Sequence, residues 1–91
     1  MSVRVKLCDA YKPVMPGRPD FVEVNGATIN ECFRDLIRKY PQLEKYIYDY
    51  PGEMCEALMI FHNGLSLSHE ELNRPVKEED EIFPLMMIGG G

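Results

Sequence analysis

The residues best suited to chemistry lie at the C-terminal end, where the chain finishes in Gly89, Gly90 and Gly91. Glycine has no Cβ, so this backbone can pass through a channel too narrow for side chains and bring its terminal carboxylate close to another molecule. A carboxylate can attack the α-phosphate of ATP to form an acyl-adenylate, a mixed anhydride that is open to nucleophiles. The sequence contains neither of the nucleotide-binding motifs GxxxxGK(S/T) and GxGxxG. We therefore expect the chain to be the substrate of a separate activating enzyme.

An apolar run at residues 85–88 precedes the glycines. Exposed apolar stretches usually mark a surface that something else covers, and Met adapts easily to such contacts. We expect a partner protein to be bound by Phe83, Leu85, Met86, Met87 and Ile88. Pro84 cannot donate a ladder hydrogen bond, so the last strand is expected to end near Phe83 or Leu85. Two alternatives stay open: the run completes the strand and core, or the glycines are a frayed end or a remnant of cloning.

Other reactive residue types give weaker signals. The three cysteines, Cys8, Cys32 and Cys55, are widely spaced and form no CxxC pair, which favours core residues over a persulfide carrier. His62 and His69, with Ser66 and Ser68, lack an evident orienting partner for nucleophilic catalysis. The glutamates beside His69 and at residues 78–81 favour a solvated acidic face over a metal site. The five tyrosines are expected to pack rather than to stack on nucleic-acid bases.

Length and charge limit the function further. Ninety-one residues make one small domain, and ten Lys and Arg against fifteen Asp and Glu give a net charge of −5. This is the wrong sign for binding nucleic acid or anionic lipid, although it could steer the chain to a basic groove on an activating enzyme. An odd number of cysteines, no signal peptide and no apolar run near ~20 residues indicate a cytoplasmic protein.

The hydrophobic pattern predicts an ordered series of elements. Alternation predicts strands at residues 3–8 and 21–25, paired as a hairpin across a proline-rich loop at 9–19. A capping box from Thr28 to Glu31 begins a helix that Pro41 ends. Its apolar stripe consists of Ile29, Phe33, Leu36, Ile37 and Tyr40. The remaining predicted elements are a helix at 42–50, a buried strand at 54–62, an Asn63-Gly64 turn, a brief strand at 65–67, a helical turn at 68–72 and a last strand from Ile82.

This order favours an α+β roll of the β-grasp kind, with a mixed sheet of four to five strands and one main helix packed across it. We expect residues 1–84 to form the domain and residues 85–91 to be an extended tail of that same domain.

The sequence resembles the small ubiquitin-like sulfur carriers of the MoaD/ThiS family, which include the small subunit of molybdopterin synthase and the thiamine-pathway sulfur carrier. The resemblance covers nearly the whole chain. Its markers are Val3-Arg4-Val5-Lys6-Leu7, Val24-Asn25-Gly26-Ala27-Thr28-Ile29, Tyr40-Pro41-Gln42-Leu43, His62-Asn63-Gly64, Asp80-Glu81-Ile82-Phe83-Pro84 and terminal Gly90-Gly91. The helix followed by Tyr-Pro-x-Leu favours the molybdopterin branch.

The resemblance implies a protein co-substrate without a bound cofactor. An E1-like enzyme would use ATP to adenylate Gly91, which would then become a thiocarboxylate, with Gly90 and Gly89 giving clearance. The sulfur would pass to a partner such as the large subunit of molybdopterin synthase or thiazole synthase. A thiamine-type or other sulfur carrier, a ubiquitin-like modifier of target lysines and a β-grasp interaction domain without tail chemistry remain alternatives.

Three features depart from the family pattern. The tail has one glycine more than the usual pair, so its reach is offset by one residue. Glu79 stands where the family usually has Gly, and the 9–19 loop is rich in proline where the molybdopterin branch often begins a helical turn.

Overall fold

The protein is described by a computed structural model that covers residues 1–50 and 53–86. The main sheet consists of β1 (Ser2–Lys6), β2 (Phe21–Asn25), β5 (Leu58–His62), β6 (Leu65–Leu67) and β7 (Glu81–Met86). Its strand order is β2-β1-β7-β5-β6, so β7 is the central strand. A small second sheet pairs β3 (Tyr48–Tyr50) with β4 (Glu53–Met54). Helices α1 (Ile29–Lys39) and α2 (Glu44–Ile47) are supplemented by 3₁₀ turns at Lys12–Val14, Pro41–Leu43 and His69–Glu71.

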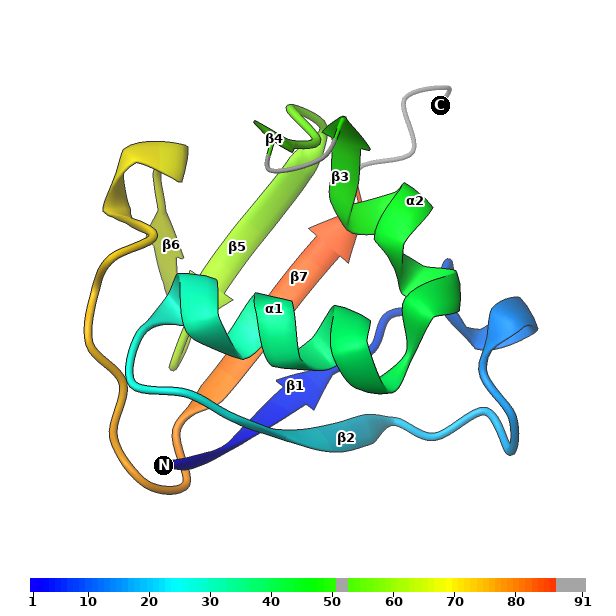
Figure 1. The fold of residues 1–91 in the computed structure, drawn as a ribbon, viewed down its shortest axis with the longest axis horizontal. Helices are drawn as coiled ribbons and strands as arrows, with labels where there is room; N and C mark the ends of the chain where they lie inside the picture. Colours follow the sequence, from blue (N-terminus) through cyan, green and yellow to red (C-terminus); the bar gives the residue numbers. More distant parts are fainter. Residues whose placement is uncertain (51–52, 87–91) are drawn as a thin grey trace.

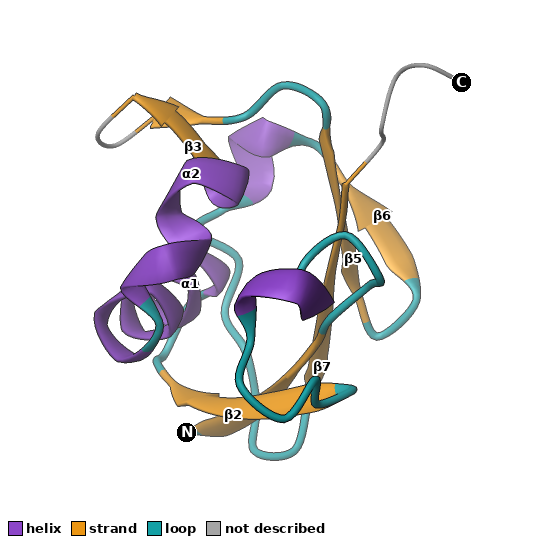
Figure 2. Cartoon of the chain, turned by 90° about the vertical axis from the view of Figure 1, so that its right-hand side faces the viewer, coloured by secondary structure: helices purple, strands orange, loops and turns teal. Residues whose placement is uncertain are grey.

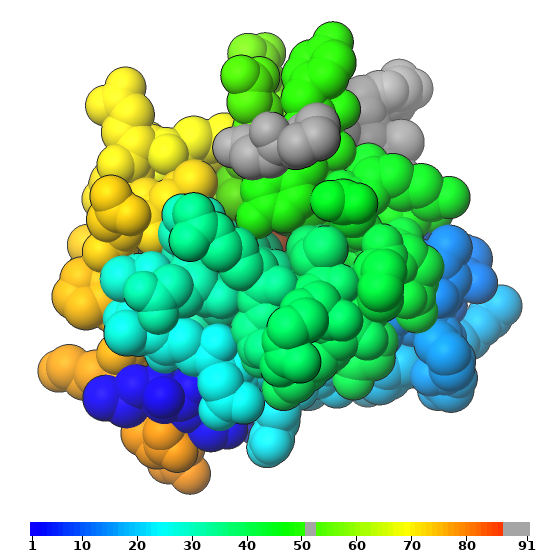
Figure 3. Space-filling model, in the orientation of Figure 1, coloured from blue at the N-terminus to red at the C-terminus, as the bar shows by residue number. Residues whose placement is uncertain are grey.

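The helices and the sheet form two layers. Helix α1 lies across the sheet, and both helices are on the same side of it (Figures 1 and 2). In the space-filling view, side chains of α1 and of the segment that follows it spread over this face of the molecule (Figure 3). In the described part of the chain, no helix lies on the opposite face, which we call the open face (Figure 2). This arrangement confirms the predicted α+β roll with a five-stranded mixed sheet and one main helix.

The predicted hairpin of β1 and β2 is confirmed. The strands are antiparallel, and Val3 lies opposite Val24 while Val5 lies opposite Val22. All four valines are buried, whereas the residues between them face solvent, because successive strand side chains point to opposite sides. β1 also pairs with β7 in parallel, which makes the sheet mixed.

Helix α1 begins where the sequence predicted. Thr28 Oγ1 accepts a hydrogen bond from the Glu31 N–H at 3.1 Å, and the Glu31 carboxylate accepts from the Ala27 N–H at 3.0 Å rather than from Thr28. Two further N–H groups of the first turn, those of Ile29 and Asn30, donate to the backbone carbonyls of Arg74 and Leu72. The segment before β7 therefore completes the cap of the helix.

Two predicted elements are wrong in part. The helix expected at 42–50 ends at Ile47, and residues 48–50 form β3, where Tyr48 pairs with Met54. Alternating Tyr and Asp residues suit an exposed strand better than a further helical turn. The strand expected at 54–62 is divided into β4 and β5 by a turn in which the Leu58 N–H donates to the Cys55 carbonyl.

The shorter elements agree with the pattern except in the first loop. Asn63 and Gly64 have φ angles of 49° and 85°, as a two-residue hairpin turn requires. The turn after Ser68 has a complete capping box with Glu71. The 9–19 loop, expected to be irregular, contains the Lys12–Val14 turn and sends Tyr11 and Met15 into the core, which its proline content concealed.

β7 extends to Met86, beyond the end expected near Phe83 or Leu85. Pro84 is accommodated because β1 pairs with β7 only at Glu81 and Ile82, so Pro84 has no β1 partner. On the other side, β5 pairs with β7 as far as Met86.

Glu79 occupies a backbone conformation that favours glycine, with a φ of 68°. We predict that Glu79→Gly raises the free energy of unfolding by about 0.5–1 kcal/mol, because relief of the left-handed strain exceeds the extra entropy of the unfolded chain. Urea unfolding checks this, with Glu78→Gly at the neighbouring position as the control. Equal losses of stability in the two variants would contradict the prediction.

Candidate functional site

The predicted site residues fall partly outside the described chain. Met87, Ile88, Gly89, Gly90 and Gly91 lie outside it, so their roles as contact residues, clearance and modification site remain predictions. Phe83, Leu85 and Met86 lie in β7, the central strand of the sheet (Figure 1).

Phe83 and Leu85 both lie on the open face of the sheet. Phe83 is opposite Phe61 in the β5–β7 register, and their ring centroids are 6.1 Å apart. The Lys6 Nζ atom lies 5.1 Å from the centroid of the Phe83 ring. Leu85 is opposite Met59, whose side chain is 37% exposed. Met86 differs, because it packs against the core on the helix side.

Further apolar side chains share this face. Phe21 on β2 is 39% exposed, and the Arg4 guanidinium lies 5.0 Å from its ring centroid. We define the open-face patch as Phe21, Met59, Phe61, Phe83 and Leu85. The sequence predicted only Phe83 and Leu85 as contact residues. The alternation of β5, with Leu58, Ile60 and His62 buried, was the signal that could have identified the others.

Two positively charged side chains of β1 adjoin the patch: Arg4 lies over the Phe21 ring, and Lys6 lies over the Phe83 ring. The acidic residues Glu23, Glu78 and Glu79 line a hollow together with Ser2 and Arg4, at the end of β1 where the strand begins. Because β1 and β7 are parallel, this acidic end of the sheet is opposite the end where β7 meets the tail.

The cysteines fit the core interpretation. Cys32 is buried in the face of α1, and burial raises the pKa of its thiol to about 11. Cys8 and Cys55 are free thiols that pack half-buried against the core. A thiol with a raised pKa is a poor nucleophile at neutral pH, so Cys32 is not suited to carrying a persulfide.

His62 and His69 are held by structural hydrogen bonds rather than by serines. His62 Nε2 lies 2.8 Å from Asp80 Oδ2, and its Nδ1 accepts from the Arg74 Nε–H at 3.2 Å. His69 Nε2 donates to the Leu58 carbonyl at 2.8 Å. Both ring nitrogens of His62 are occupied, so His62 offers no free base to Ser66 or Ser68. Within residues 1–50 and 53–86, no group of three or more His, Cys, Asp and Glu side chains is placed to hold a metal ion.

The lowered pKa of the Asp80 carboxyl makes the free energy of unfolding depend on pH. Burial alone would raise its pKa, but hydrogen bonds from Asn63, His62 and the Lys77 N–H outweigh burial and lower the pKa from 3.8 to about 2. The ionised carboxylate therefore stabilises the folded state above about pH 5, and this stabilisation is lost as the pH falls toward 2.

We expect the lost stabilisation to be about 1–2 kcal/mol. Urea unfolding at pH 7 and pH 3 should show a smaller pH dependence for Asp80→Asn than for the wild-type chain. Asp9→Asn is the control, because the Asp9 side chain is 99% exposed. The same pH dependence in the wild type and in Asp80→Asn would contradict this assignment.

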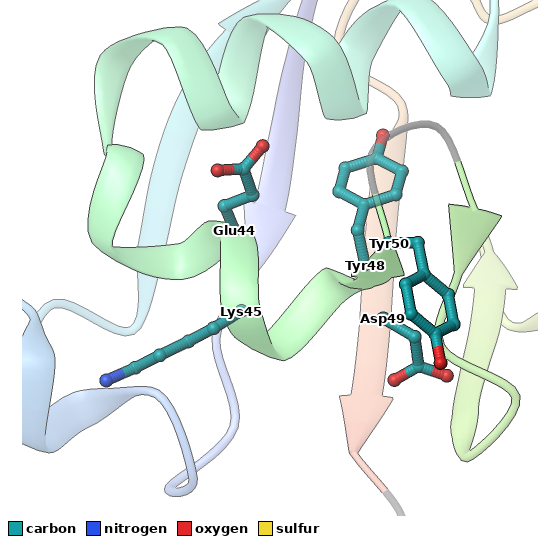
Figure 4. Close-up of a pocket in the computed structure, with 5 residues that line it drawn as sticks. All are labelled: Glu44, Lys45, Tyr48, Asp49 and Tyr50. Carbon is teal, nitrogen blue, oxygen red and sulfur yellow. The ribbon is translucent and has the colours of Figure 1, made fainter.

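A shallow hollow of about 330 Å³ lies on the other side of the molecule, over α2 and β3. It is lined by Glu44, Lys45, Tyr48, Asp49 and Tyr50, and in Figure 4 the Lys45 side chain extends away from the two tyrosines. Tyr48 is half-buried, and burial raises its pKa, whereas Tyr50 is 68% exposed. The mixed charges favour no single class of ligand.

The mixed sheet crossed by one helix, with the C-terminal strand at its centre, is the β-grasp fold of ubiquitin-like proteins. Within the described residues, no helix has the length and apolar character needed to cross a membrane.

Solved structures place the chain within this class of folds. The solution structure of small archaeal modifier protein 1 (SAMP1) from Methanosarcina acetivorans is 27% identical, with 99% of this chain and 96% of that chain covered and a TM-score of 0.83. The crystal structure of SAMP1 from Haloferax volcanii is 21% identical over the full length of both chains, with a TM-score of 0.82. The Amycolatopsis orientalis BexX/CysO complex matches at 21% identity, covering 98% of this chain and 99% of that chain, with a TM-score of 0.81. No protein-family model and no curated protein matches the sequence.

Proposed function

We propose that the chain is a ubiquitin-like sulfur carrier, a protein co-substrate activated at its C-terminal carboxylate. The observation that carries the proposal is the connection between the central strand and the glycine tail. β7 is held by neighbours on both sides and leads directly into the segment that ends in Gly91. The full-length likeness of the fold to SAMP1 and to the CysO-containing complex supports it.

The chemistry requires two substitution steps, the first at the α-phosphorus of ATP and the second at the acyl carbon of Gly91. A carboxylate oxygen of Gly91 attacks the α-phosphate of ATP on an E1-like enzyme, and pyrophosphate leaves. A sulfide sulfur then attacks the acyl carbon, and AMP leaves as the thiocarboxylate forms. With a persulfide donor, the same attack releases AMP and gives an acyl disulfide, and a thiol then reduces its S–S bond to free the thiocarboxylate. Gly89 and Gly90 contribute clearance, because a side chain there would obstruct a narrow entry channel.

The open-face patch supplies the docking surface in this proposal. Large, partly exposed aromatic side chains such as Phe21 and Phe83 contribute strongly to protein interfaces. Two residues of the patch, Phe83 and Leu85, lie on β7, the strand that continues into the tail, so a partner that covers the patch also receives the carboxylate. The solved BexX/CysO complex contains a chain whose fold is similar to that of this chain. We propose that this chain likewise binds a partner protein.

We propose molybdopterin synthesis as the first destination of the sulfur, on the basis of Tyr40-Pro41-Gln42-Leu43 after α1. The acceptor would be a large synthase subunit, and a thiazole synthase is the acceptor in the alternative pathway. Both reactions would take place in the cytoplasm.

A second candidate function is covalent modification of other proteins. The printed name of SAMP1 describes a modifier, and SAMP1 matches this chain over nearly its whole length. In that case a lysine amine of the target attacks the acyl carbon of the adenylate, AMP leaves, and an isopeptide bond forms.

Mass spectrometry of the intact protein separates these functions. The chain is incubated with the E1-like enzyme of its own host, ATP and a sulfide source. A sulfur carrier gains the mass difference of one oxygen replaced by sulfur, whereas a modifier forms adducts that resist reducing agent and nucleophile. If the mass stays unchanged under conditions that charge a known carrier, the proposal of a sulfur carrier is wrong.

A further inference from the structure

β7 loses one of its backbone partners just before the tail. The parallel pairing with β1 ends at Ile82, whereas the β1–β2 ladder continues one step further, with the Leu7 N–H donating to the Asp20 carbonyl. Pro84 has no N–H of its own with which to form a further ladder bond. From Phe83 onward, backbone pairing therefore holds β7 only along β5.

Tyr11 takes the place of β1 beside Pro84. Its hydroxyl donates a buried hydrogen bond to the Pro84 carbonyl at 2.8 Å, across 73 residues of sequence. Burial raises the pKa of Tyr11, so its hydroxyl remains a donor at any physiological pH. This side-chain bond fastens the last residue before the predicted tail.

The Tyr11 ring is itself firmly held. It has no exposed surface, and its ring meets that of Tyr46 edge to face, with centroids 5.7 Å apart and planes at 87°. The Gln42 side chain ties the same loop to the helix layer by donating to the Val14 carbonyl at 3.2 Å. The anchor at Pro84 is thus connected through the loop to the helix layer.

We propose that Tyr11 is a positioning residue that fixes the direction in which the tail leaves the sheet. The inference rests on the proposed function, because it assigns the tail to the active site of an activating enzyme. The bond holds Pro84 in one position, and the chain continues from there to the carboxylate. A larger share of docked complexes then holds the carboxylate in position to react with ATP.

Hydrogen exchange tests the anchor without any enzyme. In Tyr11→Phe, we expect the more protected of the Leu85 and Met86 amides to exchange at least about tenfold faster, while amides in α1 stay within about twofold. Tyr46→Phe keeps the Tyr11–Pro84 bond and is the matched control. The proposal is overturned if the Leu85 and Met86 amides of Tyr11→Phe exchange at the wild-type rate, or if exchange is accelerated equally throughout α1 and β7.

Kinetics with the E1-like enzyme of the host test the consequence. Tyr11→Phe should lower kcat for ATP–pyrophosphate exchange about three- to tenfold and leave KM within about twofold, because the open-face patch is unchanged. Tyr46→Phe should match the wild type. An unchanged kcat in Tyr11→Phe would overturn the positioning role. If the wild-type chain itself supports no exchange, the proposed function fails, and hydrogen exchange still decides whether Tyr11 anchors the tail.

Discussion

A chain that lacks Gly91 is expected to be adenylated at least about 100-fold more slowly than the full-length chain. The shortened chain still ends in the usual glycine pair, Gly89 and Gly90, but its carboxylate is reached ~3.5 Å earlier along an extended tail. A displacement of this size removes the carboxylate from the geometry in which it can attack the α-phosphate. ATP–pyrophosphate exchange and intact mass after incubation with the activating enzyme measure the effect.

Gly90→Ala separates the effect of tail length from the effect of clearance in the entry channel. This variant keeps the reach of the tail and adds one methyl group. We expect it to block charging, because the methyl group obstructs a narrow entry channel. Far-UV circular dichroism and thermal unfolding should be unchanged in both variants, since neither residue contributes a side chain to the core. Normal charging of the shortened chain would show that the third glycine is dispensable. Normal activity in cells without Gly90 and Gly91 would favour an interaction domain.

Elements with local signals were predicted correctly from the sequence. The β1–β2 hairpin follows from valines that alternate with polar residues, and α1 follows from Thr28 and a stripe at helical spacing. These signals lie within a few residues of one another, so they do not depend on the rest of the fold. The end of α2 was missed for a different reason. Residues 42–50 have apolar side chains at helical spacing, but Tyr48 pairs with Met54 as a strand, and this pairing ends the helix and separates β4 from β5.

The same distinction applies to the site. Phe83 and Leu85 could be predicted because they adjoin the tail in sequence. The alternation of β5 could have placed Phe61 and Met59 on the outer face of the sheet. Their position beside Phe83 and Leu85 could not be predicted, because it depends on the β5–β7 register. Tyr11 gave no sequence signal, since its hydroxyl bonds to the carbonyl of Pro84, 73 residues away along the chain.

Gly26→Ala is expected to lower the free energy of unfolding by about 3 kcal/mol, a large share of the stability of a domain of this size. Gly26 joins β2 to α1, where a Cβ would lie 2.7 Å from the Cys32 amide nitrogen and 3.0 Å from the Glu31 carbonyl carbon. These obstacles are backbone atoms at the start of the helix, so no change of side-chain conformation can relieve the contact. The strand and helix must separate, which opens the core beneath them.

Gly17→Ala separates close approach from backbone strain. Gly17 has a φ of 77° with nothing within 4 Å of an added Cβ, so its substitution should cost only about 1 kcal/mol. A Cβ at Gly26 would also lie 3.0 Å from the Cys32 sulfur. Adding Cys32→Ala to Gly26→Ala should therefore fail to restore stability, because the closer contact is with the backbone. Urea unfolding of the three variants measures these differences. A loss for Gly26→Ala no larger than for Gly17→Ala would show that β2 and α1 can move apart at little cost.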